Sequence, residues 1–191
     1  MYRHPFSALA LIAAFGTSAF GDPEAPKYAG KVSALRVEAA ALGNGWTGPT
    51  GLVVDDFRDL DAHPPEVRRV VEELKKQVAP LGVTAAADFT YRKASDPFEA
   101  VTLRIFVFDS EKSRRDWWRK KYQFDGWEKL YGVVEGVPYD ALDSKQTPKR
   151  IVSFGNVLLT CGQLKTSGDH RKVLDLYVAK IKDAVRGGAS K

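Results

Sequence analysis

Cysteine is nearly absent from this chain of 191 residues, in which Cys161 is the only one. A single thiol forms no disulfide within the chain, so a folded domain must be stabilised by the burial of apolar side chains. The C-x-x-C spacing of zinc and redox sites is excluded for the same reason. Because Cys161 lies in the apolar stretch 157–161, which is typical of a strand, we predict a buried and inert thiol.

Histidine is scarce as well, and the motifs of common enzyme classes are missing. The chain has three histidines and contains no G-x-S-x-G, no H-E-x-x-H and no G-x-x-x-x-G-K motif. Two of the histidines, His63 and His170, lie beyond the N-terminal segment, and charged residues near each of them predict solvated side chains. These motifs and histidines thus identify no catalytic residue, no metal-ligand set and no cofactor.

No apolar run approaches the roughly 20 residues that a membrane-spanning helix needs. The longest run, residues 9–15, follows a basic start and precedes small residues, which is the layout of a secretory signal peptide. Small side chains at Ala19 and Gly21 predict cleavage at the Gly21-Asp22 bond. We therefore expect residues 1–21 to be a signal peptide and the protein to be exported, periplasmic or secreted, with no transmembrane segment.

Charge of one sign is in only slight excess. The whole chain has 29 basic and 24 acidic side chains, and removal of the leader takes away Arg3 alone. The resulting mild positive charge favours solubility, but it falls short of the concentrated basicity of a nucleic-acid-binding protein. Nucleic acid is therefore disfavoured as a partner.

The remaining chain predicts one α+β domain. Residues 22–34 mix proline, glycine, alanine and charge, which indicates a flexible lead-in, and residues 35–188 form a single globular domain. Within the domain we predict helices over 65–79, 110–122 and 169–185 and strands over 83–92, 101–108, 150–154 and 157–161, with further short strands at 52–54 and 131–134. Consecutive strands joined as hairpins predict an antiparallel sheet, which is covered here by about three helices. A glycine-rich loop is expected over residues 43–51, and residues 124–149 read as irregular.

An acidic stretch offers one possible chemistry. Asp55, Asp56, Asp59 and Asp61 lie close enough in sequence to supply oxygen ligands, but their spacing lacks the register and the central glycine of a calcium loop. Carboxylates here could instead act as acid and base in a cleft near Trp46. An enzyme of unfamiliar type is therefore kept as an alternative.

The most unusual segment is 111–122, where basic residues alternate with two tryptophans. On a helical projection Lys112, Arg115, Arg119 and Lys120 form a basic stripe, and the tryptophans occupy the opposite arc. The candidate ligand-binding residues are Arg114, Arg115, Trp118, Arg119, Lys120 and, in the glycine-rich loop, Trp46. Such a surface suits a phosphate group, an anionic glycan or an anionic membrane surface. In the alternative interpretation the tryptophans seal the sheet and the cations simply face water.

The order of these segments resembles a known plan. Gly45-Trp46-Thr47, the strand 101–108 with its following helix, and the closing segment 150–159 with the hairpin Phe154-Gly155-Asn156 are similar to exported bacterial domains of unknown function with a PsbP/Mog1-like order of elements. That resemblance implies a binding or assembly role, and it transfers no functional residue.

Together these observations favour a non-enzymatic binding or assembly module that contacts an anionic or protein partner. Possible partners are an anionic glycan, a phosphate group, a membrane surface or an envelope protein. The alternatives are an enzyme that uses the loop carboxylates and a structural envelope protein.

Overall fold

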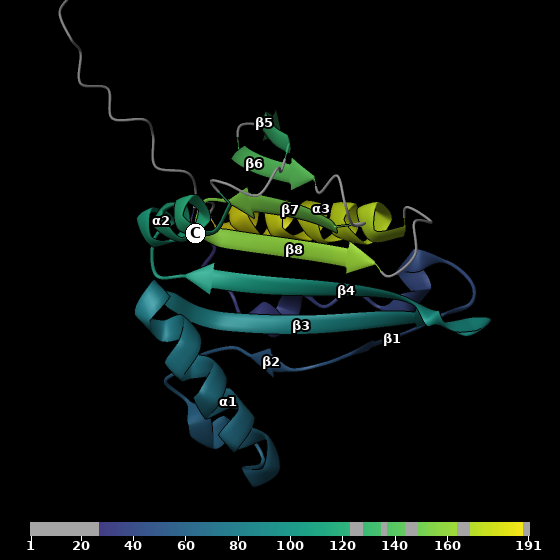
Figure 1. The fold of residues 1–191 in the computed structure, drawn as a ribbon, viewed down its shortest axis with the longest axis horizontal. Helices are drawn as coiled ribbons and strands as arrows, with labels where there is room; N and C mark the ends of the chain where they lie inside the picture. The colour runs from purple at the N-terminus through teal and green to yellow at the C-terminus, as the bar shows by residue number, and fades with distance from the viewer. Residues whose placement is uncertain (1–26, 123–127, 135–136, 144–148, 164–168, 189–191) are drawn as a thin grey trace, which may run out of the picture.

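The computed structural model describes residues 27–122, 128–134, 137–143, 149–163 and 169–188. In these residues eight antiparallel strands form one sheet in the order β1-β3-β4-β8-β7-β6-β5, and β2 pairs with β3 (Figure 1). The strands are β1 (Trp46–Thr50), β2 (Val53–Val54), β3 (Val83–Lys93), β4 (Asp96–Phe108), β5 (Glu128–Val134), β6 (Val137–Asp143), β7 (Lys149–Phe154) and β8 (Val157–Gln163). The helices are α1 (Pro65–Val78), α2 (Glu111–Tyr122) and α3 (Asp169–Gly188), with short 3-10 turns η1 (Val32–Leu35), η2 (Ala39–Leu42), η3 (Leu60–Ala62) and η4 (Ala79–Leu81). The predicted α+β class is confirmed.

One face of the sheet carries the larger core. Side chains that alternate along the central strands, such as Leu103 and Ile105 of β4, point to this face and are fully buried. α3 packs against them with Leu174, Tyr177 and Ile181, which share one side of the helix. Figure 1 shows α3 behind β7 and β8.

The opposite face carries a smaller core at one end only. Val71 of α1, Trp118 of α2 and Phe108 of β4 meet there with other buried side chains, among them Val54, Phe57, Val83, Ala86, Ile151 and Leu158. Further along β4 on this face, Thr102 is only half-buried and Arg104 is exposed. β4 is central, as its apolar pattern predicts, but the described residues cover its second face only near Phe106 and Phe108.

The packed domain includes part of the segment 22–34, which was expected to be a flexible lead-in. Tyr28 and Val32 are buried in the larger core. The amide side chain of Asn156 holds this segment, because its Oδ1 accepts from the backbone N–H of Tyr28 at 2.8 Å and its Nδ2 donates to the Tyr28 carbonyl at 3.1 Å. Residues 27–34 are therefore an integral part of the domain.

Two segments form strands where loops were expected. The glycine-rich segment contains β1, which pairs with β3 in an irregular register between Thr47 and Thr50. Positive φ angles at Gly45, Gly48 and Gly51 bend the chain there. Farther on, β5 and β6 pair inside the stretch 124–149; β5 contains the short strand predicted over 131–134, whereas β6 was not predicted. Glycine permits a bent edge strand, so its presence there did not exclude pairing.

None of the helices in the described part of the chain is long and apolar enough to cross a membrane.

Candidate ligand-binding groove

Arg114, a candidate ligand-binding residue, is buried. Only 4% of its surface is exposed. Its Nε donates to the carbonyl of Gly155 at 2.8 Å, its Nη1 donates to Ser153 Oγ at 2.9 Å, and its Nη2 lies 3.4 Å from Glu111 Oε1. This guanidinium joins α2 to the β7–β8 hairpin.

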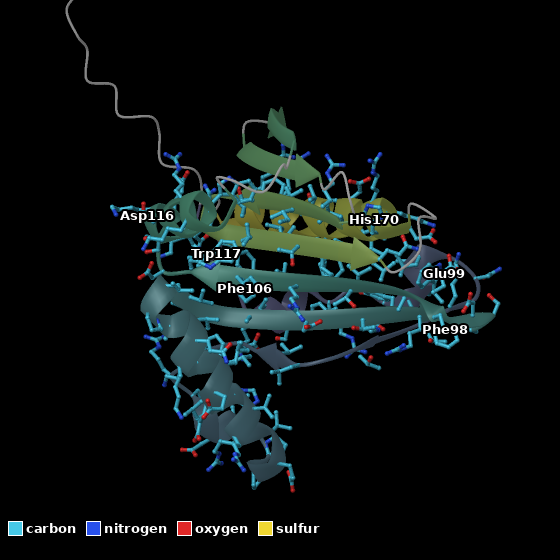
Figure 2. All side chains as sticks on the ribbon, in the orientation of Figure 1. Phe98, Glu99, Phe106, Asp116, Trp117 and His170 are labelled. Atoms are coloured by element: carbon cyan, nitrogen blue, oxygen red, sulfur yellow. The ribbon has the colours of Figure 1, made fainter. Side chains whose placement is uncertain are left out.

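The two tryptophans of α2 pack on the sheet. Trp118 is 6% exposed and belongs to the smaller core. The ring of Trp117 lies 6.2 Å from that of Phe106 and 6.1 Å from that of Phe108, and Figure 2 shows Trp117 beside Phe106. These distances fit aromatic packing, so the tryptophans seal this end of the sheet.

On the outer face of α2, Lys112 and Arg115 face water, each close to an acidic neighbour. Lys112 Nζ lies 2.6 Å from Asp116 Oδ2, and Arg115 Nη2 lies 2.5 Å from Glu111 Oε1. Lys120 is exposed. The side chain of Arg119 lies outside the described residues. The surface that remains available on this helix is thus formed by Lys112, Arg115 and Lys120.

Trp46 lies away from that helix. It pairs with Lys93 at one end of β3, whereas α2 follows Phe108, which pairs with Val83 at the other end (Figure 1). The ammonium of Lys93 stands 5.2 Å from the centre of the half-buried Trp46 ring. The structure therefore does not bring Trp46 together with the residues of α2.

The carboxylates of the acidic stretch each hold a local partner. Asp55 accepts two hydrogen bonds from Ser33, both at 2.7 Å. Hydrogen bonds from Arg58 lower the pKa of Asp56. The other two carboxylates interact with residues close in sequence. Asp59 accepts a hydrogen bond from the backbone N–H of Ala62 at 3.2 Å, and Asp61 forms an ion pair with Arg68 at 3.3 Å. The described residues contain no group of three or more His, Cys, Asp or Glu side chains that could hold a metal ion.

The solvated state expected for His170 is wrong. His170 is 7% exposed, and its backbone N–H donates to Gln163 Oε1 at 3.1 Å, with its Nδ1 3.3 Å from the same oxygen. The predicted burial of Cys161 is confirmed, and burial raises the pKa of its thiol. That thiol therefore lacks the thiolate character that reactive cysteines need.

A groove opens on the second face of the sheet, beside α1. It has a volume of about 210 Å³. Its walls come from α1, β3, β4 and the residue before β2. The lining side chains are Leu52, Leu74, Ala86, Ala87, Asp88, Arg104 and Phe106. Most of this lining is apolar, and it lies where the smaller core ends and the polar part of the sheet begins.

An ion pair stands at the polar side of the groove. Arg104 and Asp88 face each other across β4 and β3, and Arg104 Nε donates to Asp88 Oδ2 at 2.9 Å. The Arg104 side chain is 60% exposed. Within the described residues its two Nη atoms have no hydrogen-bond partner, so their N–H groups can donate to a ligand.

Sequence reasoning missed this groove because its residues come from four separate segments. The one local signal is the position of Asp88 and Arg104, since each interrupts an apolar strand. A charged side chain on one face of a central strand indicates that the face is open there.

Comparison with known proteins identifies no family for this chain. No protein-family model and no curated protein matches it. Among solved structures it is similar to the extracellular domain of PknH from Mycobacterium tuberculosis, with a TM-score of 0.39 and 11% sequence identity over 81% of this chain and 94% of that one.

Proposed function

We propose that this protein is an exported, non-enzymatic binding module whose ligand occupies the groove beside α1. The observation that carries the proposal is the meeting of an apolar floor with the unpartnered Nη atoms of Arg104. An apolar pocket with a few placed polar groups is the usual form of a small-ligand site. Export rests on the leader-like residues 1–21.

The two alternatives have less support. The acidic-stretch carboxylates that were considered for catalysis hold separate local partners, and the pKa of Asp56 is lowered where a general acid would need a raised pKa. The large apolar side chains exposed in the described residues are Val70, Leu81 and Phe98. They lie on different elements, and Phe98 is at the far end of the sheet from α1 (Figure 2), so they form no single assembly surface.

The groove is tested by mapping ligand binding on the ¹⁵N-labelled protein. We expect small anionic probes to shift amide resonances of Asp88, Arg104 and Phe106 at low salt. Shifts confined to other surfaces would contradict the proposed site.

A second candidate surface is the basic stripe on α2, which is favoured by the exposure of Lys112, Arg115 and Lys120. Its partner would be a polyanion, because separate exposed cations bind anionic polymers through summed, salt-sensitive attraction. The variant Arg115→Glu/Lys120→Glu should lose retention on a sulfated-glycan column. The matched control Arg69→Glu/Lys76→Glu on α1 makes the same change in net charge, and equal loss in both variants would refute a specific role for the stripe.

A further inference from the structure

We infer that the ligand of the groove is a carboxylate with a single negative charge and one apolar group about the size of an aromatic ring. This inference rests on the proposed function, because it names the class of ligand that the same groove would bind.

The size of the apolar group follows from the volume of the groove. A cavity of about 150 Å³ lined by aliphatic and aromatic side chains binds benzene. The groove here measures about 210 Å³ and is open on one side. It therefore has room for one ring or a short acyl chain lying between Leu74 and Phe106.

The carboxylate follows from the way Arg104 is held. Its Nε is occupied by Asp88, which fixes the plane of the guanidinium. The two Nη atoms then present parallel N–H donors, the arrangement that a carboxylate accepts in bidentate fashion. A flexible ammonium would lack this preference for a planar anion.

The restriction to a single negative charge on the ligand follows from the position of the Asp88 carboxylate. Its carboxylate stays close to any anion bound by Arg104, so a second negative charge on the ligand would meet repulsion at short range. The same carboxylate is the less accessible partner for a ligand, because its side chain is 35% exposed against 60% for that of Arg104. The pair thus selects a monoanion over a dianion and over a cation.

The test is an NMR titration of the full protein with four probes that share one phenyl group. The probes are 3-phenylpropionate, the neutral 3-phenylpropanol, the cationic 3-phenylpropylamine and the dianionic phenylsuccinate. We expect 3-phenylpropionate to bind about fivefold more tightly than the alcohol, since an exposed ion pair contributes up to about 1 kcal/mol. The amine and the dianion should bind more weakly than the monoanion.

Five variants assign the effect to individual side chains. Arg104→Gln should make the acid and the alcohol bind equally, whereas Asp88→Asn should tighten the acid severalfold by removing a nearby negative charge. Arg69→Gln, on the exposed side of α1, should leave the preference unchanged. Leu74→Trp should block the groove for all four probes, and Lys76→Trp, which adds the same ring at an exposed position on the other side of α1, should not. Unchanged thermal unfolding shows that each variant is folded.

The possible failures are distinguishable. Equal binding of acid and alcohol, with shifts in the groove, would overturn the carboxylate inference and leave the groove as a binding site. Preference for the amine, abolished by Asp88→Asn, would also overturn it. If Arg69→Gln weakened the acid as much as Arg104→Gln, only general charge would be at work and the inference would fail. Absence of groove shifts with every probe would overturn both the inference and the proposed function.

Discussion

At the scale of single residues, Arg114 shows how burial changes the meaning of a charged side chain. The sequence placed it among exposed cations, yet its guanidinium bridges to a carbonyl and a hydroxyl that lie 41 and 39 residues farther along the chain. A buried charge persists only when its donors are satisfied. Arg114 is therefore a structural residue that fastens α2.

Replacing Arg114 should destabilise the fold. Arg114→Met removes the donors to Gly155 and Ser153 and leaves their oxygens buried, which should cost about 3 kcal/mol of unfolding free energy. Arg115→Met, one position along the same helix but exposed, should change it by no more than about 0.5 kcal/mol. Urea unfolding measures both. Equal costs in the two variants would contradict the structural role of Arg114.

Two buried tyrosines form a second residue-scale feature. Tyr91 donates its hydroxyl proton to the carbonyl of Val37 at 2.6 Å, and the hydroxyls of Tyr91 and Tyr177 are 2.7 Å apart. The backbone N–H of Val37 donates to Tyr177 at 3.3 Å and closes the ring of hydrogen bonds. Burial raises the pKa of both tyrosines, and it raises the pKa of Tyr28 to about 12.

These raised pKa values predict a loss of stability in alkali. A tyrosine of the unfolded chain ionises near pH 10, whereas these three stay neutral in the folded state. Below about pH 10 the three tyrosines make their full contribution to the free energy of unfolding. Above pH 10 this contribution falls by about 1.4 kcal/mol per pH unit for each tyrosine. Urea unfolding between pH 8 and 11.5 measures the decline. Tyr91→Phe/Tyr177→Phe should make it shallower, and an unchanged slope in that variant would refute this assignment.

At the scale of elements, the β7–β8 turn fastens other parts of the fold. Asn156 binds the Tyr28 backbone in both directions, and its Nδ2 also donates to the carbonyl of Phe108 at 2.9 Å. The turn thereby connects the N-terminal segment, the end of β4 and, through Gly155, helix α2. The sequence marked Gly155-Asn156 as a tight turn, and the structure adds this role in packing.

A change at Asn156 should release the N-terminal segment. Asn156→Asp keeps the shape but replaces both donors by an acceptor, so the carbonyls of Tyr28 and Phe108 lose their partner. We expect faster amide hydrogen exchange at Tyr28 and Val32 and a stability loss of about 2 kcal/mol. Asn44→Asp, at an exposed position, is the control. Protection at Val32 that survives in Asn156→Asp would contradict the proposed anchoring.

Most elements could be predicted because their apolar residues repeat with a regular period. α1, α2, α3, β3, β7 and β8 agree with the sequence to within a few residues. β1 and β6 could not be located in the same way, and β5 only over residues 131–134, because these strands lie in segments with glycine or mixed polarity. Their pairing is decided by neighbouring strands: β1 and β5 are edge strands with little apolar surface, and β6 joins β5 to β7.

At the scale of the whole molecule, export remains a prediction from the leader. When the full chain is produced in a bacterium with its secretion system, the intact mass of the exported protein should correspond to a start at Asp22. Ala19→Asp should keep the leader attached, because the peptidase accepts only small side chains at that position, whereas Phe20→Ala should be processed normally. A mature start elsewhere would contradict the proposed cleavage site.

The sequence by itself determined the α+β class, the main helices and strands, the burial of Cys161 and the apolar side of α2. These follow from the spacing of apolar residues along short segments, which sets the face that each element buries. Only the tertiary structure decided that Arg114 and His170 are buried, that Trp46 lies far from α2, and that Asp88 and Arg104 border a groove. The environment of a polar side chain depends on partners from distant segments, and no local pattern records them.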